Sequence, residues 1–232
     1  MRKQTASVTK WVVACVMLGL VHTAWSSTIP FSTDFESDTI GSEPSGFALL
    51  KDTGFAGNSL DVIAAESAFV DGPYSAETGG PGSQALQWLD TNVSDSNPDI
   101  VVFDLATGTT DDLVMRFDFV NISGNHLRFQ VFDDSATRPI RLHLDNGGTI
   151  KNNGGGDILE YTGSGLNRWH SLIITTDLAN NTYNLEMKRQ ERALVLVYED
   201  LPFNNAVSNF GSWQFNDLAG SSSTSEYYLD NI

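Results

Sequence analysis

The sequence contains only one cysteine, Cys15, among its 232 residues. This cysteine lies in the N-terminal segment that is predicted below to be removed. The mature chain therefore forms no disulfide and has no thiol available for catalysis or metal binding. Its stability must come from the hydrophobic core or from a bound ion, and its length is sufficient to bury a sizeable core.

Basic residues are also scarce. Lys and Arg together number 13 against 29 Asp and Glu, and the formal net charge is −16. The negative electrostatic field of such a chain repels nucleic acids and anionic membrane surfaces. We therefore expect neither class of partner to be bound through overall charge. The acidic surplus also keeps a protein soluble without any specific ligand.

The sequence has no apolar run long enough to cross a membrane. Its longest such segment, Trp11–Val21, has eleven residues, whereas a membrane-spanning helix needs about 20. Basic residues precede it, and the small residues Ala24 and Ser26 follow it. These features predict a secretory signal peptide over residues 1–26. The mature chain, residues 27–232, is then one extracellular or cell-surface domain without a transmembrane segment.

A helical period of 3.6 residues is missing from the mature chain, apart from a weak signal over 61–69. Short alternations of apolar and polar residues instead lie between Gly, Asn, Asp and Ser clusters. The clearest predicted strands are 85–90, 100–105, 113–120, 126–132, 139–144, 169–177, 182–190, 193–199, 209–215 and 225–232. A turn at Asp145–Gly148 predicts a hairpin from 139–144 to 149–151. This pattern predicts an all-β, two-sheet antiparallel jelly-roll sandwich.

Three segments carry a resemblance to a known family. They are Asp34–Phe47, the pair Trp169–Asp177 and Thr182–Leu185, and the closing segment Tyr228–Ile232. They resemble the secreted bacterial laminin-G-like and concanavalin-A-like jelly-roll domains. The resemblance implies a two-sheet jelly roll that often carries a structural calcium and often binds glycans or cell-surface partners. Hydrolases and lyases share this fold, so the fold alone does not decide the activity.

The acidic residues near the two chain ends form the first candidate site. Asp34 and Glu36 share one face of a predicted strand, and Asp230 lies in the last one. If these two segments pair side by side, the three carboxylates converge on one hard cation, and Ca²⁺ favours such oxygen ligands. The alternative is that these acids are solvated or hydrogen-bonded at a strand edge.

Polar pairs on three successive predicted strands form the second candidate site. Each pair has an arginine followed two residues later by another polar residue: Arg116 with Asp118, Arg128 with Gln130, and Arg141 with His143. Period-two geometry predicts that all six lie on the outer face of one sheet. Arginine binds carboxylates and sulfates in a bidentate manner, so an acidic polysaccharide is the expected ligand. The alternative is that these residues only form cross-strand ion pairs.

These observations predict a secreted, non-catalytic module that binds a polysaccharide or a cell-surface glycan. One alternative is a polysaccharide lyase or glycoside hydrolase acting on an acidic glycan, with Arg128 or Arg141, His143 and Tyr161 in the reaction. The sequence has no Gly-x-Ser-x-Gly motif and no Glu-x-Asp-x-x-Glu motif. A second alternative is a structural module of a larger surface protein. Apolar alternation around Trp169 predicts that it packs in the core.

Overall fold

The structure is a computed structural model. It describes residues 35–42, 44, 48–50, 59–64, 84–90, 100–123, 126–145, 149–152, 156–160, 169–189, 192–217, 225–230 and 232. The predicted signal peptide and Asp34 lie outside these residues. No helix that is long and apolar enough to cross a membrane occurs among the residues described.

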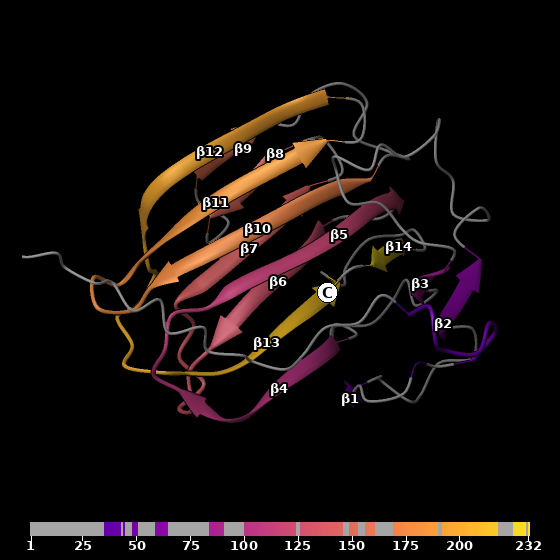
Figure 1. Cartoon of the computed structure of the whole chain (residues 1–232), viewed down its shortest axis with the longest axis horizontal. Coiled ribbons are helices and arrows are strands. Elements are labelled where there is room, and N and C mark those ends of the chain that lie inside the picture. Colours follow the sequence, from indigo (N-terminus) through magenta and orange to yellow (C-terminus); the bar gives the residue numbers. More distant parts are fainter. Residues whose placement is uncertain are drawn as a thin grey trace, which may run out of the picture.

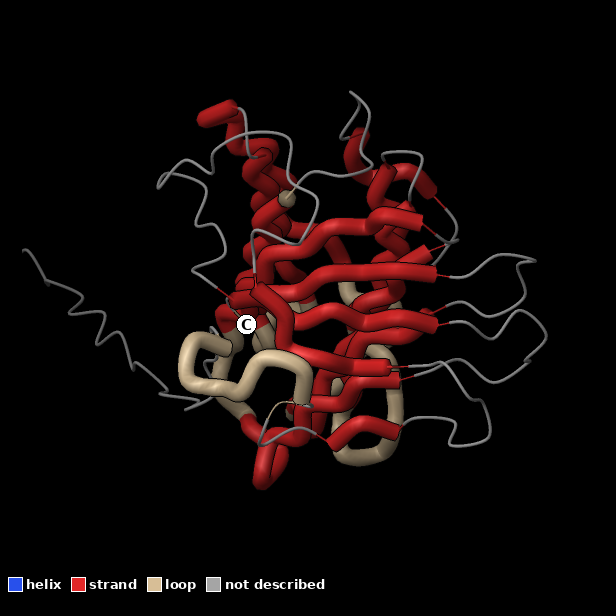
Figure 2. The backbone as a smooth tube through the Cα atoms, turned by 90° about the vertical axis from the view of Figure 1, so that its right-hand side faces the viewer, coloured by secondary structure: helices blue, strands red, loops and turns tan. Residues whose placement is uncertain are grey.

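The described residues form fourteen strands in two antiparallel sheets (Figures 1 and 2). Sheet A contains, in spatial order, β1 (Ala48–Leu50), β4 (Ile100–Thr109), β13 (Phe210–Asp217), β6 (His126–Phe132), β7 (Ile140–Asp145), β8 (Thr149–Asn152) and β9 (Gly156–Glu160). Sheet B contains β12 (Arg192–Pro202), β11 (Thr182–Arg189), β10 (His170–Asp177), β5 (Val114–Ser123), β14 (Ser225–Asp230), β3 (Gln84–Asp90) and β2 (Ser59–Ala64). The predicted all-β, two-sheet jelly-roll class is confirmed.

Each of the ten predicted strands overlaps a strand of the structure, and β7 and β8 form the predicted hairpin. The weak helical prediction for 61–69 is wrong over its described part, because Asp61–Ala64 belongs to β2. In β2, Leu60 and Val62 are both fully buried, and their period-two spacing decides the conformation. The prediction also missed β1 and β9, which contain only three and five residues.

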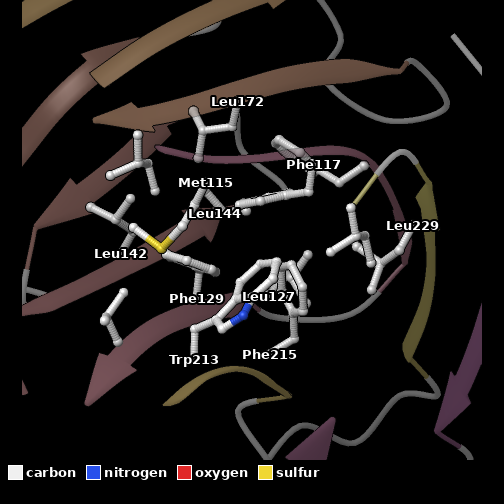
Figure 3. Close-up of a cluster of buried hydrophobic side chains, with 14 of the residues drawn as sticks. Met115, Phe117, Leu127, Phe129, Leu142, Leu144, Leu172, Trp213, Phe215 and Leu229 are labelled. Atoms are coloured by element: carbon white, nitrogen blue, oxygen red, sulfur yellow. The ribbon is translucent and has the colours of Figure 1, made fainter. Parts of the chain in front are cut away.

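An aromatic core fills the space between the two sheets (Figure 3). Phe117 of β5 lies with its ring centroid 4.8 Å from that of Phe215 in β13 and 5.0 Å from that of Phe129 in β6. Trp213 packs edge-on against Phe129, and Trp88 belongs to the same cluster. These rings hold sheet B against sheet A, since burying each aromatic side chain contributes on the order of 2 kcal/mol or more.

A second, smaller cluster of buried side chains lies on the other side of sheet B. It consists of Ala85, Val120, Trp169 and Tyr228, with the half-buried Ile63 packed against it. Val120 follows the core residue Phe119, so period-two alternation turns it to the outer face. Trp169 is fully buried as predicted, although it packs in this outer cluster and not between the sheets.

The turn between β6 and β7 packs closely against two neighbouring strands. Oδ1 of Asp133 accepts hydrogen bonds from the backbone N–H groups of Ser135 and Thr137, at 2.8 and 2.7 Å. Asp134 lies directly over Gly108 and Gly211, where a Cβ atom would meet its carboxylate. At Gly108 the exposed Asp134 side chain could move aside, whereas at Gly211 the added atom would also meet backbone atoms of Asp133 and Asp134.

We predict that Gly211→Ala destabilises the domain by about 1–3 kcal/mol through overpacking. The added Cβ would lie 2.7 Å from Oδ1 of Asp134 and 3.0 Å from backbone atoms of Asp133 and Asp134. Urea denaturation measures the change, and Ser212→Ala on the adjacent, half-buried position is the control. If Gly211→Ala is as stable as Ser212→Ala, the turn moves away from the added methyl group without a cost in folding free energy.

Candidate functional site

The candidate site lies on the outer face of sheet A, on β13, β6, β7 and β8. Core residues such as Phe129 and Leu142 alternate with polar residues that face outward. The strand register aligns these polar residues in two rows. The first row is Asn216, Arg128, His143 and Lys151, and the second is Gln214, Gln130 and Arg141.

A network of amides occupies the β13–β6 half of this face. Nε2 of Gln130 donates a 2.8 Å hydrogen bond to Oδ1 of Asn216, and Nε2 of Gln214 donates to the same oxygen at 3.1 Å. Gln130 and Asn216 are only 1% and 3% exposed. Oε1 of Gln130 is buried and accepts no hydrogen bond within the described part of the chain. Of the three amides, Gln214 alone is half-buried, so most of this network is closed to a ligand at the surface.

Positively charged side chains occupy the β6–β8 half of the face. Arg128, Arg141 and Lys151 are all half-buried there. Burial, and then the nearby positive charge of Arg138, lower the pKa of Arg141 from its ordinary value. Because the ordinary value is so high, the guanidinium still carries its charge at neutral pH. The face therefore combines hydrogen-bonding amides with fixed positive charge.

The structure brings four of the six predicted ligand-binding residues together and separates the other two. Arg128, Gln130, Arg141 and His143 share the outer face of sheet A as predicted, and their binding role stays a prediction. Arg116 and Asp118 belong to β5, which lies in sheet B, so grouping all six on one sheet is wrong. Sequential neighbours β5 and β6 lie in opposite sheets, which residue periodicity alone does not reveal.

Arg116 and Asp118 instead form a pair on the outer face of sheet B. Nη2 of Arg116 lies 3.9 Å from Oδ1 of Asp118. The arginine is 44% exposed and the aspartate is fully buried. Asp118 stands opposite Asp230 in the strand register, and both aspartates are fully buried.

Sequence reasoning missed Gln214, Asn216 and Lys151. The alternation of Trp213 and Phe215 with polar residues marks Gln214 and Asn216 as outward-facing. That signal did not indicate that β13, far away in the sequence, lies beside β6. Lys151 lies in the short strand β8 after the predicted hairpin, directly opposite His143.

The predicted pairing of the two end segments is wrong in the part that the structure describes. Both edges of β14 are occupied, by β3 on one side and β5 on the other. Phe35 begins a turn, in which the N–H of Asp38 donates to its carbonyl oxygen at 3.0 Å. Oε1 of Glu36 accepts a 2.9 Å hydrogen bond from the N–H of Gln84, the first residue of β3.

The calcium site stays a prediction. Asp34 lies outside the described residues, and those that are described contain no group of three or more His, Cys, Asp or Glu placed to hold a metal ion. Leu229 pairs with Leu86, which places Asp230 near the start of β3, where Glu36 is bound. Two of the three predicted ligands therefore approach the same end of sheet B.

A hydrogen-bonded triad also lies on the outer face of sheet B. The hydroxyl of Tyr228 donates to Oε1 of Glu226 at 2.5 Å, and Nε2 of Gln87 donates to the same oxygen at 2.7 Å. Burial, and then the hydrogen bond to Glu226, raise the pKa of Tyr228 well above its ordinary value. The phenol is therefore a neutral donor at neutral pH, and we assign the triad a structural role.

The chain matches no family model and no curated protein. Among solved structures, the cellulose-induced protein Cip1 aligns with a TM-score of 0.52 at 12% identity, over 87% of this chain and 94% of Cip1. Lectin II from Ulex europaeus aligns with a TM-score of 0.48 at 11% identity, over 87% of this chain and 98% of the lectin. A sialidase aligns with a TM-score of 0.48 at 15% identity, over 82% of this chain, which spans 18% of the sialidase. The likeness to Cip1 shows the fold alone and agrees with the jelly-roll class.

We predict that the domain loses stability at alkaline pH through Tyr183 and Tyr228, because burial raises the pKa of both phenols. Above about pH 10 the unfolded tyrosines lose their protons while the folded ones keep them, so the free energy of unfolding falls as pH rises. Urea denaturation between about pH 9 and about pH 11 measures this slope. Tyr183→Phe with Tyr228→Phe should flatten it, and an unchanged slope in that variant contradicts the assignment.

Proposed function

We propose that this protein is a secreted, non-catalytic carbohydrate-binding domain. Its ligand, a polysaccharide or cell-surface glycan, binds on the outer face of sheet A. The observation that carries this proposal is a set of half-buried polar side chains aligned across this face, Gln214, Arg128, Arg141 and Lys151. The predicted signal peptide supports the extracellular location.

The chemistry of this face suits a sugar. Amides such as that of the half-buried Gln214 donate and accept hydrogen bonds, as sugar hydroxyl groups also do. Arginine adds bidentate donors for a carboxylate or sulfate.

We predict that Arg128→Ala combined with Arg141→Ala weakens binding of acidic polysaccharides by about tenfold or more. Each lost charge-assisted hydrogen bond costs about 1.5–3 kcal/mol. Native affinity electrophoresis against acidic and neutral polysaccharides measures the loss of retardation. The melting temperature should change little, because both side chains lie outside the core.

The matched control is Arg116→Ala, which removes an arginine from the opposite sheet. It should leave retardation by every polymer unchanged. If Arg116→Ala weakens binding as much as the double variant does, the ligand does not bind on sheet A. If no polysaccharide retards the wild-type protein, the carbohydrate-binding proposal is wrong, and a structural role becomes the better explanation.

A lyase acting on an acidic glycan is the second candidate, because Arg128 and His143 are direct cross-strand neighbours. A lyase needs a positive charge to neutralise the uronate and a base to remove a proton, and these two residue types serve those roles. Tyr161, the third predicted participant, lies outside the described residues. Chain cleavage of a retarded polymer, abolished by His143→Asn, would favour this activity over simple binding.

We further propose a structural calcium with Asp34, Glu36 and Asp230 among its ligands. Asp230 lies near the start of β3, where Glu36 accepts a hydrogen bond from the N–H of Gln84, so two of the proposed ligands lie at one end of sheet B. Carboxylate oxygens are the ligands that Ca²⁺ prefers. The bound ion would fasten the N-terminal segment to the end of sheet B.

Calcium should raise the melting temperature of the domain, and a chelator should lower it. Ca²⁺ at 100 times its Kd adds about 2.7 kcal/mol to the free energy of unfolding. Asp230→Asn should abolish the response, whereas Asp111→Asn, at an exposed position, should preserve it. Identical melting curves for the wild type with calcium and with chelator would refute the calcium site.

A further inference from the structure

Two arginines lie close together at the start of β7. Arg141 is half-buried on the outer face of sheet A, and Arg138 is exposed in the turn that leads into the strand. Burial, and then the charge of Arg138, lower the pKa of Arg141, so the two guanidinium groups are near neighbours. Like charges placed this way repel each other, and the folded chain has to tolerate that repulsion.

The described part of the chain supplies no carboxylate partner to either arginine. The two acids of the same turn are engaged elsewhere. Oδ1 of Asp133 accepts hydrogen bonds from two backbone N–H groups, and Asp134 lies against Gly108 and Gly211 of the neighbouring strands. The buried Nε atom of Arg141 also has no acceptor among the described residues. Two neighbouring cations and a buried donor without an acceptor are the features of an anion-binding site.

The fold also holds Arg138 in position. Its carbonyl oxygen accepts a 3.0 Å hydrogen bond from Nδ2 of Asn205, and the carbonyl oxygen of Pro139 accepts one of 2.8 Å from the N–H of Asn204. The guanidinium lies over the ring of Phe132, with its Cζ atom 5.2 Å from the ring centroid. This cation–π contact restricts the side chain and requires none of its five N–H donors. Less conformational entropy is therefore lost when Arg138 binds a ligand.

We propose that Arg138 and Arg141 form an arginine pair that binds one carboxylate or sulfate group of an acidic polysaccharide. This inference rests on the proposed carbohydrate-binding function and names its ligand class. Each guanidinium donates two parallel hydrogen bonds to such a group, and an anion between them offsets their mutual repulsion. Phe132 is a positioning residue, because it acts through Arg138.

The position of the arginine pair favours a polymer over a free inorganic anion. Gln214 is half-buried on the same face, and the register places it two strands away from Arg141, on β13. Two strand spacings amount to about 10 Å. A sugar chain with its anionic group at the arginine pair can extend to Gln214, whereas a sulfate ion contacts only the arginines.

The first test compares polymers that differ mainly in charge. Polygalacturonate and its methyl ester form one pair, and a sulfated carrageenan and its desulfated form make the other. The wild-type protein should bind the charged member of at least one pair about tenfold or more tightly than its neutral counterpart. Arg138→Gln should remove most of this preference and leave affinity for the neutral polymer unchanged. Lys188→Gln, which removes a charge from the outer face of sheet B, is the matched control and should change neither affinity.

The second test locates the anion and examines the role of Phe132. An oligosaccharide fragment of the bound polymer should shift the Nε–H NMR resonance of Arg141, because the buried Nε gains an acceptor. A resonance that stays in place at saturation would overturn the proposal. Phe132→Leu should weaken binding of the charged polymer several-fold, and adding Arg138→Gln to it should cause little further loss. Independent, multiplicative losses would show that Phe132 does not act through Arg138. Melting temperatures confirm that each variant is folded.

The possible failures are distinguishable. Equal affinity for the charged and neutral members of both pairs would overturn the arginine pair as an anion site and preserve the carbohydrate-binding proposal. A wild-type protein that binds no member of either pair would overturn both. A charge preference that survives Arg138→Gln unchanged would place the anion elsewhere. Sodium sulfate that shifts the Arg141 resonance as fully as the oligosaccharide at the same concentration would overturn the assignment to a polysaccharide.

Discussion

The packing of aromatic side chains between the two sheets is the constraint on which the other features depend. Phe117, Phe129 and Phe215 meet at the centre of the sandwich, and each belongs to a strand whose side chains alternate between two faces. Once these rings face inward, Arg128, Gln130 and Asn216 must face outward. A shift of one residue in β6 would bury a guanidinium and expose Phe129, so the core also determines the composition of the candidate site.

The two outer faces of the sandwich are chemically different. On sheet B, Trp169, Val120 and Tyr228 form a buried apolar cluster, and the neighbouring carboxylates Asp118 and Asp230 are also buried. On sheet A, buried amides adjoin half-buried cations. The first arrangement resembles packing that stabilises the sheet, and the half-buried cations of the second agree with the binding role that we propose for sheet A.

The parts of the fold that depend on local periodicity could be predicted from the sequence. Ten strands and the outward orientation of Arg128, Gln130, Arg141 and His143 follow from alternation within single segments. The allocation of strands to sheets could not, because β5 and β6 are adjacent in sequence but lie in different sheets. Asn216 was missed for the same reason. β13 is far from β6 in the sequence, and only long-range packing determines that these two strands pair. The neighbours of β14 were mispredicted because sequence pattern carries no information about pairing partners.

The order of the strands in space also has a consequence for how the chain is made. β13 joins β4 to β6 in sheet A, and β14 joins β3 to β5 in sheet B. The two strands that complete the sheets are therefore synthesised after all the other strands described. Until they emerge, β1 with β4 and β2 with β3 lack hydrogen-bonding partners on one side. A chain that cannot close either sheet until β13 and β14 have been made leaves the edges of its earlier strands unpaired during that part of its synthesis.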